Sequence, residues 1–158
     1  MEREEAFVAA VREHRHRLFR IAYGILRSSA DAEDAVSEAT EAAWKALPRL
    51  RDPESLPAYL IRCTVNASRA ALRKRRHHEP LDEHIDFLPS PDAGTPVTDY
   101  VSGLKEKYRI PLILRYQENL REEDIASLLH IPRGTVSTRI TRALRMLRIE
   151  AEEEESQP

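Results

Sequence analysis

The strongest constraint on the fold of this chain is a stretch near its C-terminal end in which apolar residues recur every three to four positions. Such spacing predicts an amphipathic helix. Its apolar side consists of Val136, Ile140, Ala143 or Leu144, and Leu147. The other side carries arginine and hydroxyl groups, and no acidic residue occurs between Pro132 and Ile149. Because simple solvation would tolerate charges of both signs, a uniformly basic side indicates binding to a polyanion such as duplex DNA.

Composition favours helices along the whole chain. The 158 residues are 41% hydrophobic and 33% charged, with only four glycines and three phenylalanines. Alanine, leucine, arginine and glutamate are good helix formers, and the sequence contains no strand pattern, internal repeat or glycine-rich phosphate loop. The sequence therefore predicts an all-α fold.

Several classes of protein are excluded by what the sequence lacks. No segment approaches the roughly 20 apolar residues of a membrane-spanning helix, and the N-terminal segment lacks the apolar centre of a signal peptide. We therefore expect a cytoplasmic protein without membrane insertion. The single cysteine, Cys63, forms no internal disulfide and is predicted to be buried on a helix. The six histidines lack partners at ligand spacing, so we expect no metal and no cofactor. No catalytic constellation indicates an enzyme.

The charge distribution divides the chain into four parts. Residues 1–76 carry a net charge of +4, residues 77–97 carry −5, residues 98–149 carry +4, and residues 150–158 carry −5. The sequence therefore predicts two small basic helical domains joined by a flexible acidic linker of roughly twenty residues and followed by an acidic tail. The linker is either a plain tether or a mimic of nucleic acid. The tail either covers the basic helix or only aids solubility.

The N-terminal domain is predicted to contain helices over residues 5–27, 32–47 and 56–76. Pro48 ends the second helix, and Ser55 can cap the third, which has Pro57 in its first turn. Trp44 falls at helical spacing in an apolar run, which favours a core position. The other predicted core residues are Phe7, Val11, Leu18, Ala22, Ile25 or Leu26, then Val36, Ala39 or Thr40, Ala43 and Leu47, then Leu60, Cys63, Ala67 and Ala71.

The C-terminal domain is predicted to contain four helices. A short one lies near residues 98–104, and a longer one over residues 105–117 must accommodate Pro111. The last two, over residues 122–129 and 132–149, form a helix-turn-helix.

These two domains together resemble one family, the bacterial extracytoplasmic-function (ECF) sigma factors of RNA polymerase. In the C-terminal domain the matching motifs are Tyr108-Arg109, Leu114-Arg115-Tyr116, Asp124-Ile125-Ala126, Leu128-Leu129, and Ile131-Pro132-Arg133-Gly134-Thr135-Val136. In the N-terminal domain they are Ala32-Glu33-Asp34, Glu38, Ala43-Trp44, Tyr59-Leu60-Ile61-Arg62 and Asn66. The motifs occur in the family's order and cover nearly the whole chain.

Some positions depart from the family's pattern. Ser37 stands where the family usually has Gln, Thr40 where it has an apolar residue, Tyr59 where it has Trp, and Ser137-Thr138 where it often has Lys-Ser. Asn119 and His130 replace glycines, so we expect a left-handed backbone at both positions. Arg121 replaces the usual Ser or Thr cap, which predicts a helix start weaker by about 1 kcal/mol.

The resemblance implies a dissociable specificity subunit that binds core RNA polymerase and promoter DNA, with an anti-sigma factor as a further partner. The C-terminal domain would recognise the minus-thirty-five element through Arg133, Gly134, Thr135, Ser137, Thr138, Arg139, Arg142, Arg145 and Arg115. The N-terminal domain would melt the minus-ten element, with a flipped base held by the loop 48–56 and the adjoining duplex lined by Arg62, Asn66, Arg69 and Arg73. Core polymerase would be bound by Glu33, Asp34, Ser37 and Glu38.

Two alternatives remain at this level. The first is an autonomous helix-turn-helix regulator whose N-terminal domain mediates dimerisation. The second is an adaptor whose basic surfaces bind acidic proteins. The N-terminal motif series favours a sigma factor over the first, and the arginine side without acids argues against the second.

Overall fold

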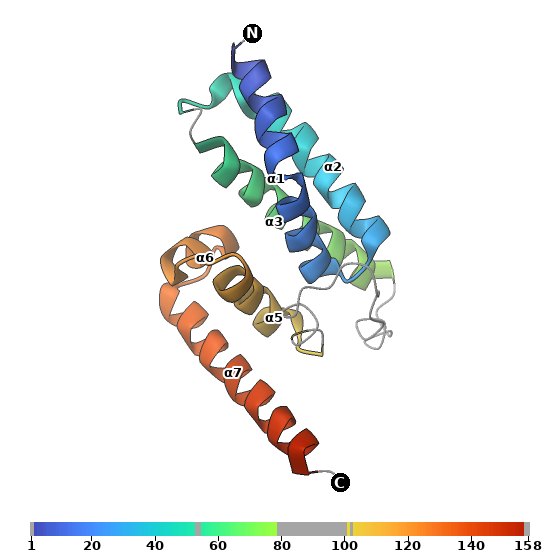
Figure 1. The fold of residues 1–158 in the computed structure, drawn as a ribbon, viewed down its shortest axis with the longest axis vertical. Helices are drawn as coiled ribbons and strands as arrows, with labels where there is room; N and C mark the ends of the chain where they lie inside the picture. The colour runs from blue at the N-terminus through green and yellow to red at the C-terminus, as the bar shows by residue number, and fades with distance from the viewer. Residues whose placement is uncertain (1, 53–54, 79–100, 102, 157–158) are drawn as a thin grey trace. The chain divides into compact units, whose positions relative to one another are not determined.

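The computed structural model describes residues 2–52, 55–78, 101 and 103–156, which form two separate helical units (Figure 1). One unit lies within residues 1–93 and the other within residues 94–158. The described residues of both units consist of helices and short turns, with no strand. The predicted all-α fold is therefore confirmed. Most of the predicted linker lies outside the described residues, as does most of the predicted helix over residues 98–104.

Three helices pack on one another in the first unit: α1 (Glu2–Leu26), α2 (Ser29–Ala46) and α3 (Leu56–His78). The C-terminal half of α1 is buried most completely, since every residue from Ile21 to Leu26 is inaccessible or nearly so. The predicted core positions of this helix are confirmed except for Val11, which is half-buried. The apolar side of α1 therefore broadens toward its C-terminal end.

Helix α2 begins at Ser29, three residues earlier than predicted. The side chain of Ser28 caps it by accepting a hydrogen bond from the amide of Asp31 at 3.2 Å. Its buried side consists only of alanines, namely Ala32, Ala35, Ala39 and Ala43. Val36 and Thr40, predicted as core residues, are half-buried because they lie beside this stripe. Alanines allow the backbone of α2 to approach α1 and α3 closely.

The predicted core position of Trp44 is wrong, because its side chain is 45% exposed. The indole contacts the ring of Phe7 edge-on, with 5.3 Å between the centroids and an angle of 60° between the planes. Since Ala43 already occupies the buried stripe, the next residue along the helix is turned by about 100° and faces outward. The indole is thus partly covered by Phe7 and partly open to solvent.

The buried side of α3 differs from the predicted side by about one residue. Cys63, Ala67 and Ala71 are half-buried, whereas the adjacent Thr64 and Ser68 are buried completely. The hydroxyl of Thr64 donates a hydrogen bond to the carbonyl of Leu60 at 2.8 Å. Such a local bond satisfies a buried hydroxyl without a partner from another helix. An apolar periodicity therefore misses these two polar core positions.

The second unit contains α5 (Glu106–Leu112), a wide π-helical turn η4 (Ile113–Gln117), α6 (Glu122–Leu129) and α7 (Arg133–Ser156). The predicted single helix over residues 105–117 is thus divided. Pro111 has no N–H to donate and lies just before the widened turn. Helix α7 packs on both α5 and α6, which completes the predicted helix-turn-helix.

The two unusual backbone positions are confirmed. Asn119 has φ 57° and His130 has φ 57°, both in the left-handed region. Arg121, the N-cap residue of α6, makes no side-chain capping hydrogen bond, as predicted from the absence of Ser or Thr. His130 ends this helix and directs the chain into α7.

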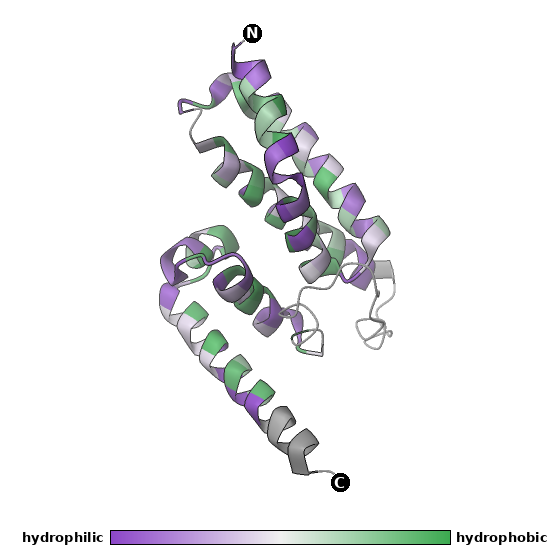
Figure 2. Ribbon diagram, viewed as in Figure 1, coloured by the Kyte–Doolittle hydropathy of each residue, from purple (hydrophilic) through white to green (hydrophobic). Residues whose placement is uncertain are grey.

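Helix α7 is amphipathic and longer than predicted. Val136, Ile140 and Ala143 are buried, while Leu144 is 42% exposed. Figure 2 shows apolar and hydrophilic segments alternating along the helix. The helix continues beyond Ile149 to Ser156. Because residues 150–156 extend the same rod, they do not fold back over the basic side of α7.

Candidate nucleic-acid interface

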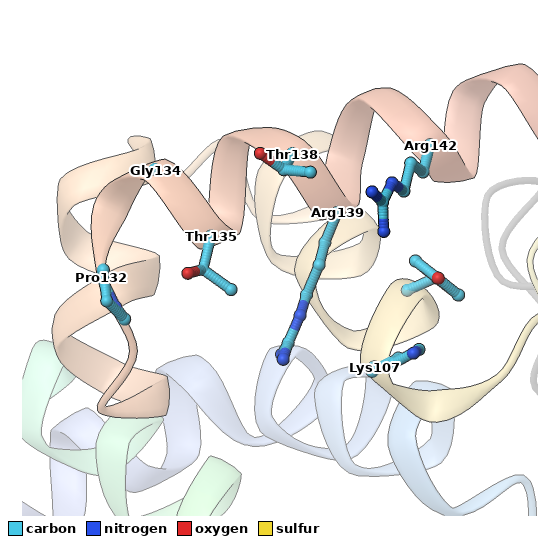
Figure 3. A pocket seen from close by; sticks show the side chains of 8 residues that line it. Lys107, Pro132, Gly134, Thr135, Thr138, Arg139 and Arg142 are labelled. Atoms are coloured by element: carbon cyan, nitrogen blue, oxygen red, sulfur yellow. The ribbon is translucent and has the colours of Figure 1, made fainter.

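An open hollow of about 600 Å³ lies between the start of α5 and the basic side of α7 (Figure 3). Two elements supply its walls. The residues from the turn before α7 and from α7 itself are Pro132, Gly134, Thr135, Thr138, Arg139 and Arg142, and those from α5 are Lys107 and Tyr108. Hydroxyl, guanidinium and ammonium groups line the hollow without a carboxylate. It is therefore suited to an anionic, hydrogen-bonding ligand.

A second open hollow of about 280 Å³ continues this surface toward the C-terminal end of α7. It shares Thr138 and Arg142 with the first hollow and adds Ser137, Thr141 and Arg145. Seven of the residues predicted from the sequence to bind DNA therefore lie on one continuous surface: Gly134, Thr135, Ser137, Thr138, Arg139, Arg142 and Arg145.

Two further candidates lie outside both hollows. Arg133 forms ion pairs with Glu123 at 3.5 Å and with Glu122 at 4.0 Å, both from α6. Arg115, in the η4 turn, donates a hydrogen bond to the carbonyl of Leu120 at 3.4 Å. Its guanidinium also lies 5.8 Å from the centroid of the Tyr116 ring. Both arginines therefore have contacts within the unit.

Lys107 and Tyr108 also line the first hollow, although they are not among the DNA-binding residues predicted from the sequence. The ammonium of Lys107 lies 5.1 Å from the centroid of the Tyr108 ring, and Arg142 donates a hydrogen bond to the Tyr108 hydroxyl. Partial burial acts to raise the pKa of Tyr108, but the charge of Lys107 and the bond from Arg142 outweigh it and hold the pKa below its ordinary value. From the sequence, Tyr108-Arg109 was identified only as a motif shared with the family, without a role in binding.

The neighbouring Arg109 has a different environment. It is completely buried, and its guanidinium donates a hydrogen bond to the carbonyl of Leu104 at 2.9 Å. A charged group buried in this way fixes the backbone around it. The start of α5 is therefore a firm support for the exposed residues on either side of Arg109.

On α3, the four candidate DNA-binding residues share one side. Arg62, Asn66, Arg69 and Arg73 follow one another at intervals of three or four residues, and all are exposed or half-exposed. Arg75, close to them in sequence, has a structural position instead. It donates to the carbonyl of Leu26 at 2.8 Å and pairs with Asp31, so that it joins all three helices.

The loop after α2 begins with a short 3-10 helix, η1 (Leu47–Arg49). Arg3 donates to the carbonyls of Leu47 and Pro48 at 3.5 and 3.4 Å. A depression beside them, lined by Arg3, Leu47, Leu50 and Leu56, has a volume of about 10 Å³, enough for one water molecule. Residues 53–54 of this loop lie outside the described residues. A pocket for a flipped base stays a prediction.

The four candidates for polymerase binding lie together on α2. Glu33, Asp34, Ser37 and Glu38 are all exposed and lie opposite the alanine stripe. Trp44 lies two helical turns beyond Ser37 on the same side. This side of α2 therefore combines carboxylates with one exposed aromatic ring.

Other chemistry is limited within the part of the chain that the structure describes. No cluster of three metal-ligating side chains occurs there, and no helix is both long and apolar enough to span a membrane. Burial raises the pKa of the Cys63 thiol, although the hydrogen bond with Tyr59 and the charge of Arg62 act in the opposite direction. The thiol therefore stays protonated at neutral pH.

Comparisons with known proteins agree with this arrangement. The Sigma-70 region 2 family matches residues 10–78, and the Sigma-70, region 4 family matches residues 96–147. The chain is 28% identical over 153 residues to RNA polymerase sigma factor SigV of Bacillus subtilis, across 94% of this chain and 92% of SigV. It is 24% identical over 165 residues to the ECF RNA polymerase sigma factor SigW of the same organism, across 92% and 88%.

A solved structure has the same fold. The sigma factor RpoE of Bartonella quintana, crystallised in complex with the anti-sigma factor NepR, superposes with a TM-score of 0.71 at 20% sequence identity, over 94% of this chain and 96% of RpoE. The two helical units thus define a sigma factor with regions 2 and 4. More narrowly, the chain belongs to the extracytoplasmic-function sigma factors.

Proposed function

We propose that this protein is a transcription initiation factor that binds core RNA polymerase and directs it to a specific set of promoters. The observation that carries this proposal is the presence of both sigma-factor regions, in order, along one chain. Such a subunit contributes recognition and leaves catalysis to the polymerase. It therefore acts where the polymerase and its DNA are, in the cytoplasm.

The second unit is suited to recognising the minus-thirty-five element as duplex DNA. Helix α7 presents Thr135, Thr138, Arg139 and Arg142 along one open surface, and a helix of this size fits the major groove. Gly134 is exposed, with nothing within 4 Å of the position that a Cβ would take, so the backbone there can approach a phosphate. Arg145, at the far end of the second hollow, is suited to a phosphate contact.

Arg133 and Arg115 have supporting roles in this proposal. Arg133 is still 65% exposed despite its ion pairs, so a phosphate can replace Glu122 and Glu123 as its partner. Arg115 is half-exposed and is suited to contact the DNA backbone beside the groove. Neither contact distinguishes one base from another.

The first unit is suited to the minus-ten element and to core polymerase. Arg62, Arg69 and Arg73 supply cations along α3 for the phosphates, and Asn66 supplies an amide for hydrogen bonding to DNA. Glu33, Asp34, Ser37 and Glu38 offer an exposed acidic side of α2 to an arginine-rich partner helix on the polymerase. The unit can thus bind DNA and polymerase through different helices.

An anti-sigma factor is proposed as a further partner. Support comes from RpoE, which has the same fold and was crystallised in complex with the anti-sigma factor NepR. A protein of that class, by covering exposed surfaces on either unit, would prevent binding to the polymerase or the promoter.

Reconstitution with core polymerase tests the proposed function. The full chain should associate with core polymerase in a pull-down and then support run-off transcription from a cognate promoter. The Glu38→Arg variant should lose much of its affinity for the polymerase, because it reverses a charge on the proposed contact side. Glu41→Ala is a matched control, since Glu41 pairs with Lys45 on the same helix at 3.2 Å and is not one of the proposed contacts. Association without any effect on initiation would overturn the proposal.

Substitution of Arg142 tests promoter recognition. Because Arg142 lines both hollows on α7, the Arg142→Ala variant should weaken promoter binding by about 1–3 kcal/mol if it contacts a base. A band-shift titration with core polymerase present measures this loss. Unchanged affinity would remove Arg142 from the proposed interface.

A further inference from the structure

The hollow beside α7 has a second wall that does not belong to the helix-turn-helix. Lys107 and Tyr108, in the first turn of α5, line it opposite Arg142 and Arg139 (Figure 3). Arg142 is an exposed side chain on α7, and its hydrogen bond to Tyr108 links the two walls. The interface therefore depends on more than one helix.

Tyr108 is held firmly at its own position. Its amide donates to the carbonyl of Lys105 at 2.9 Å, which closes the first turn of α5. The next residue, Arg109, is completely buried and donates to the carbonyl of Leu104 at 2.9 Å. The ammonium of Lys107 covers one face of the Tyr108 ring at 5.1 Å. The hydroxyl of Tyr108 is thus presented to α7 from a fixed support.

We propose that Tyr108 is a positioning residue for promoter recognition, holding the guanidinium of Arg142 in the orientation that contacts the minus-thirty-five element. This inference rests on the proposed function and adds a specificity-determining residue to it. An exposed arginine side chain is mobile and loses rotamer entropy when it is fixed. A hydrogen bond to one N–H group removes part of this loss before DNA arrives. The remaining donors of the guanidinium stay available for a base edge.

The contact itself can be tested without DNA. The full chain, labelled with ¹³C at the tyrosine Cζ atoms, gives five signals, and that of Tyr108 is the one missing from the Tyr108→Phe variant. In an NMR titration, Arg142→Ala should raise the pKa of Tyr108, because the hydrogen bond from Arg142 lowers it in the native protein. Arg145→Ala, on the same helix, should leave it unchanged. An unchanged Tyr108 pKa in Arg142→Ala would overturn the proposal.

A double-mutant cycle tests the positioning role in the complete complex. The duplex carries the upstream element of a promoter that core polymerase transcribes in the presence of the wild-type protein. Tyr108→Phe should weaken binding of the complex with core polymerase to this duplex about fivefold. In the Arg142→Ala background the same change should have an effect of less than about twofold, because Tyr108 acts through Arg142. Tyr116→Phe is the matched control, since Tyr116 is an exposed tyrosine of the same unit that lines neither hollow.

A second readout separates positioning from a general loss of stability. Tyr108→Phe should also reduce discrimination against a duplex in which the upstream element is scrambled, while affinity for core polymerase stays unchanged. Additive effects in the cycle would show that Tyr108 contacts DNA independently, and no effect of Tyr108→Phe would remove it from recognition. Either result would overturn this inference and leave the proposed function intact. Failure of the wild-type complex to bind the promoter would instead overturn the proposed function.

Discussion

Arg75 shows how one residue of a basic cluster can serve the fold instead of a ligand. Residues 73–76 are all basic, yet Arg75 donates to the carbonyl of Leu26, the last residue of α1, and pairs with Asp31 at the start of α2. Its side chain is only 20% exposed, whereas Arg73 is exposed to solvent. Neighbours in sequence therefore have different roles.

The Arg75→Ala variant should lower the free energy of unfolding of the first unit by about 2 kcal/mol. The variant leaves the carbonyl of Leu26 and the carboxylate of Asp31 without their charged partner. Urea denaturation of the full chain measures the loss. Arg73→Ala is the control and should change stability by less than about 0.5 kcal/mol. Equal effects of the two variants would contradict the structural role of Arg75.

His130 lies at φ 57° and is exposed, so its side chain contributes little that compensates for a left-handed backbone. His130→Gly should therefore stabilise the second unit by about 0.5–1 kcal/mol. Arg27 is the informative contrast. It also has positive φ, but its side chain is 6% exposed and lies 5.1 Å from the Tyr23 ring centroid. Arg27→Gly should be destabilising, and thermal unfolding should show shifts of opposite sign.

At the scale of elements, two helix starts differ in their capping. Ser28 accepts a hydrogen bond from the amide of Asp31, whereas Arg121 at the start of α6 makes no such bond. Arg121→Ser should therefore raise the stability of the second unit by about 1 kcal/mol, and Ser28→Ala should lower that of the first by a similar amount. Replacing Arg121 also removes its exposed ion pair with Asp124, which contributes little. Destabilisation by Arg121→Ser would show that this ion pair matters more than the cap.

The sequence predicted the elements well where one pattern determined them. The spacing of apolar residues alone identified Val136, Ile140 and Ala143 as the buried side of α7. The buried side of α3 could not be found from apolar spacing, because it includes a polar residue. Thr64 can be buried there since its hydroxyl donates a hydrogen bond within the helix. Lys107 and Tyr108 were missed for another reason. Their proximity to Arg142 depends on how α5 packs on α7, and local periodicity contains no information about that packing.

At the scale of the whole molecule, net charge predicts how the free protein behaves. The chain carries a net charge of −2, and each unit offers only a few basic contacts. The isolated full chain should therefore bind duplex promoter DNA with a Kd weaker than about 1 μM at physiological salt. Fluorescence anisotropy with a labelled promoter duplex, with and without core polymerase, measures the difference. Tight binding by the free chain would favour the autonomous regulator instead.

Trp44 has a practical consequence, because it is the only tryptophan of the protein and belongs to the first unit. Tryptophan fluorescence, excited at the red edge of the absorption band, would report loss of the Phe7 contact at 5.3 Å and therefore unfolding of the first unit. Circular dichroism would record both halves. Comparing the two signals would reveal whether a mutation in one half is felt by the other.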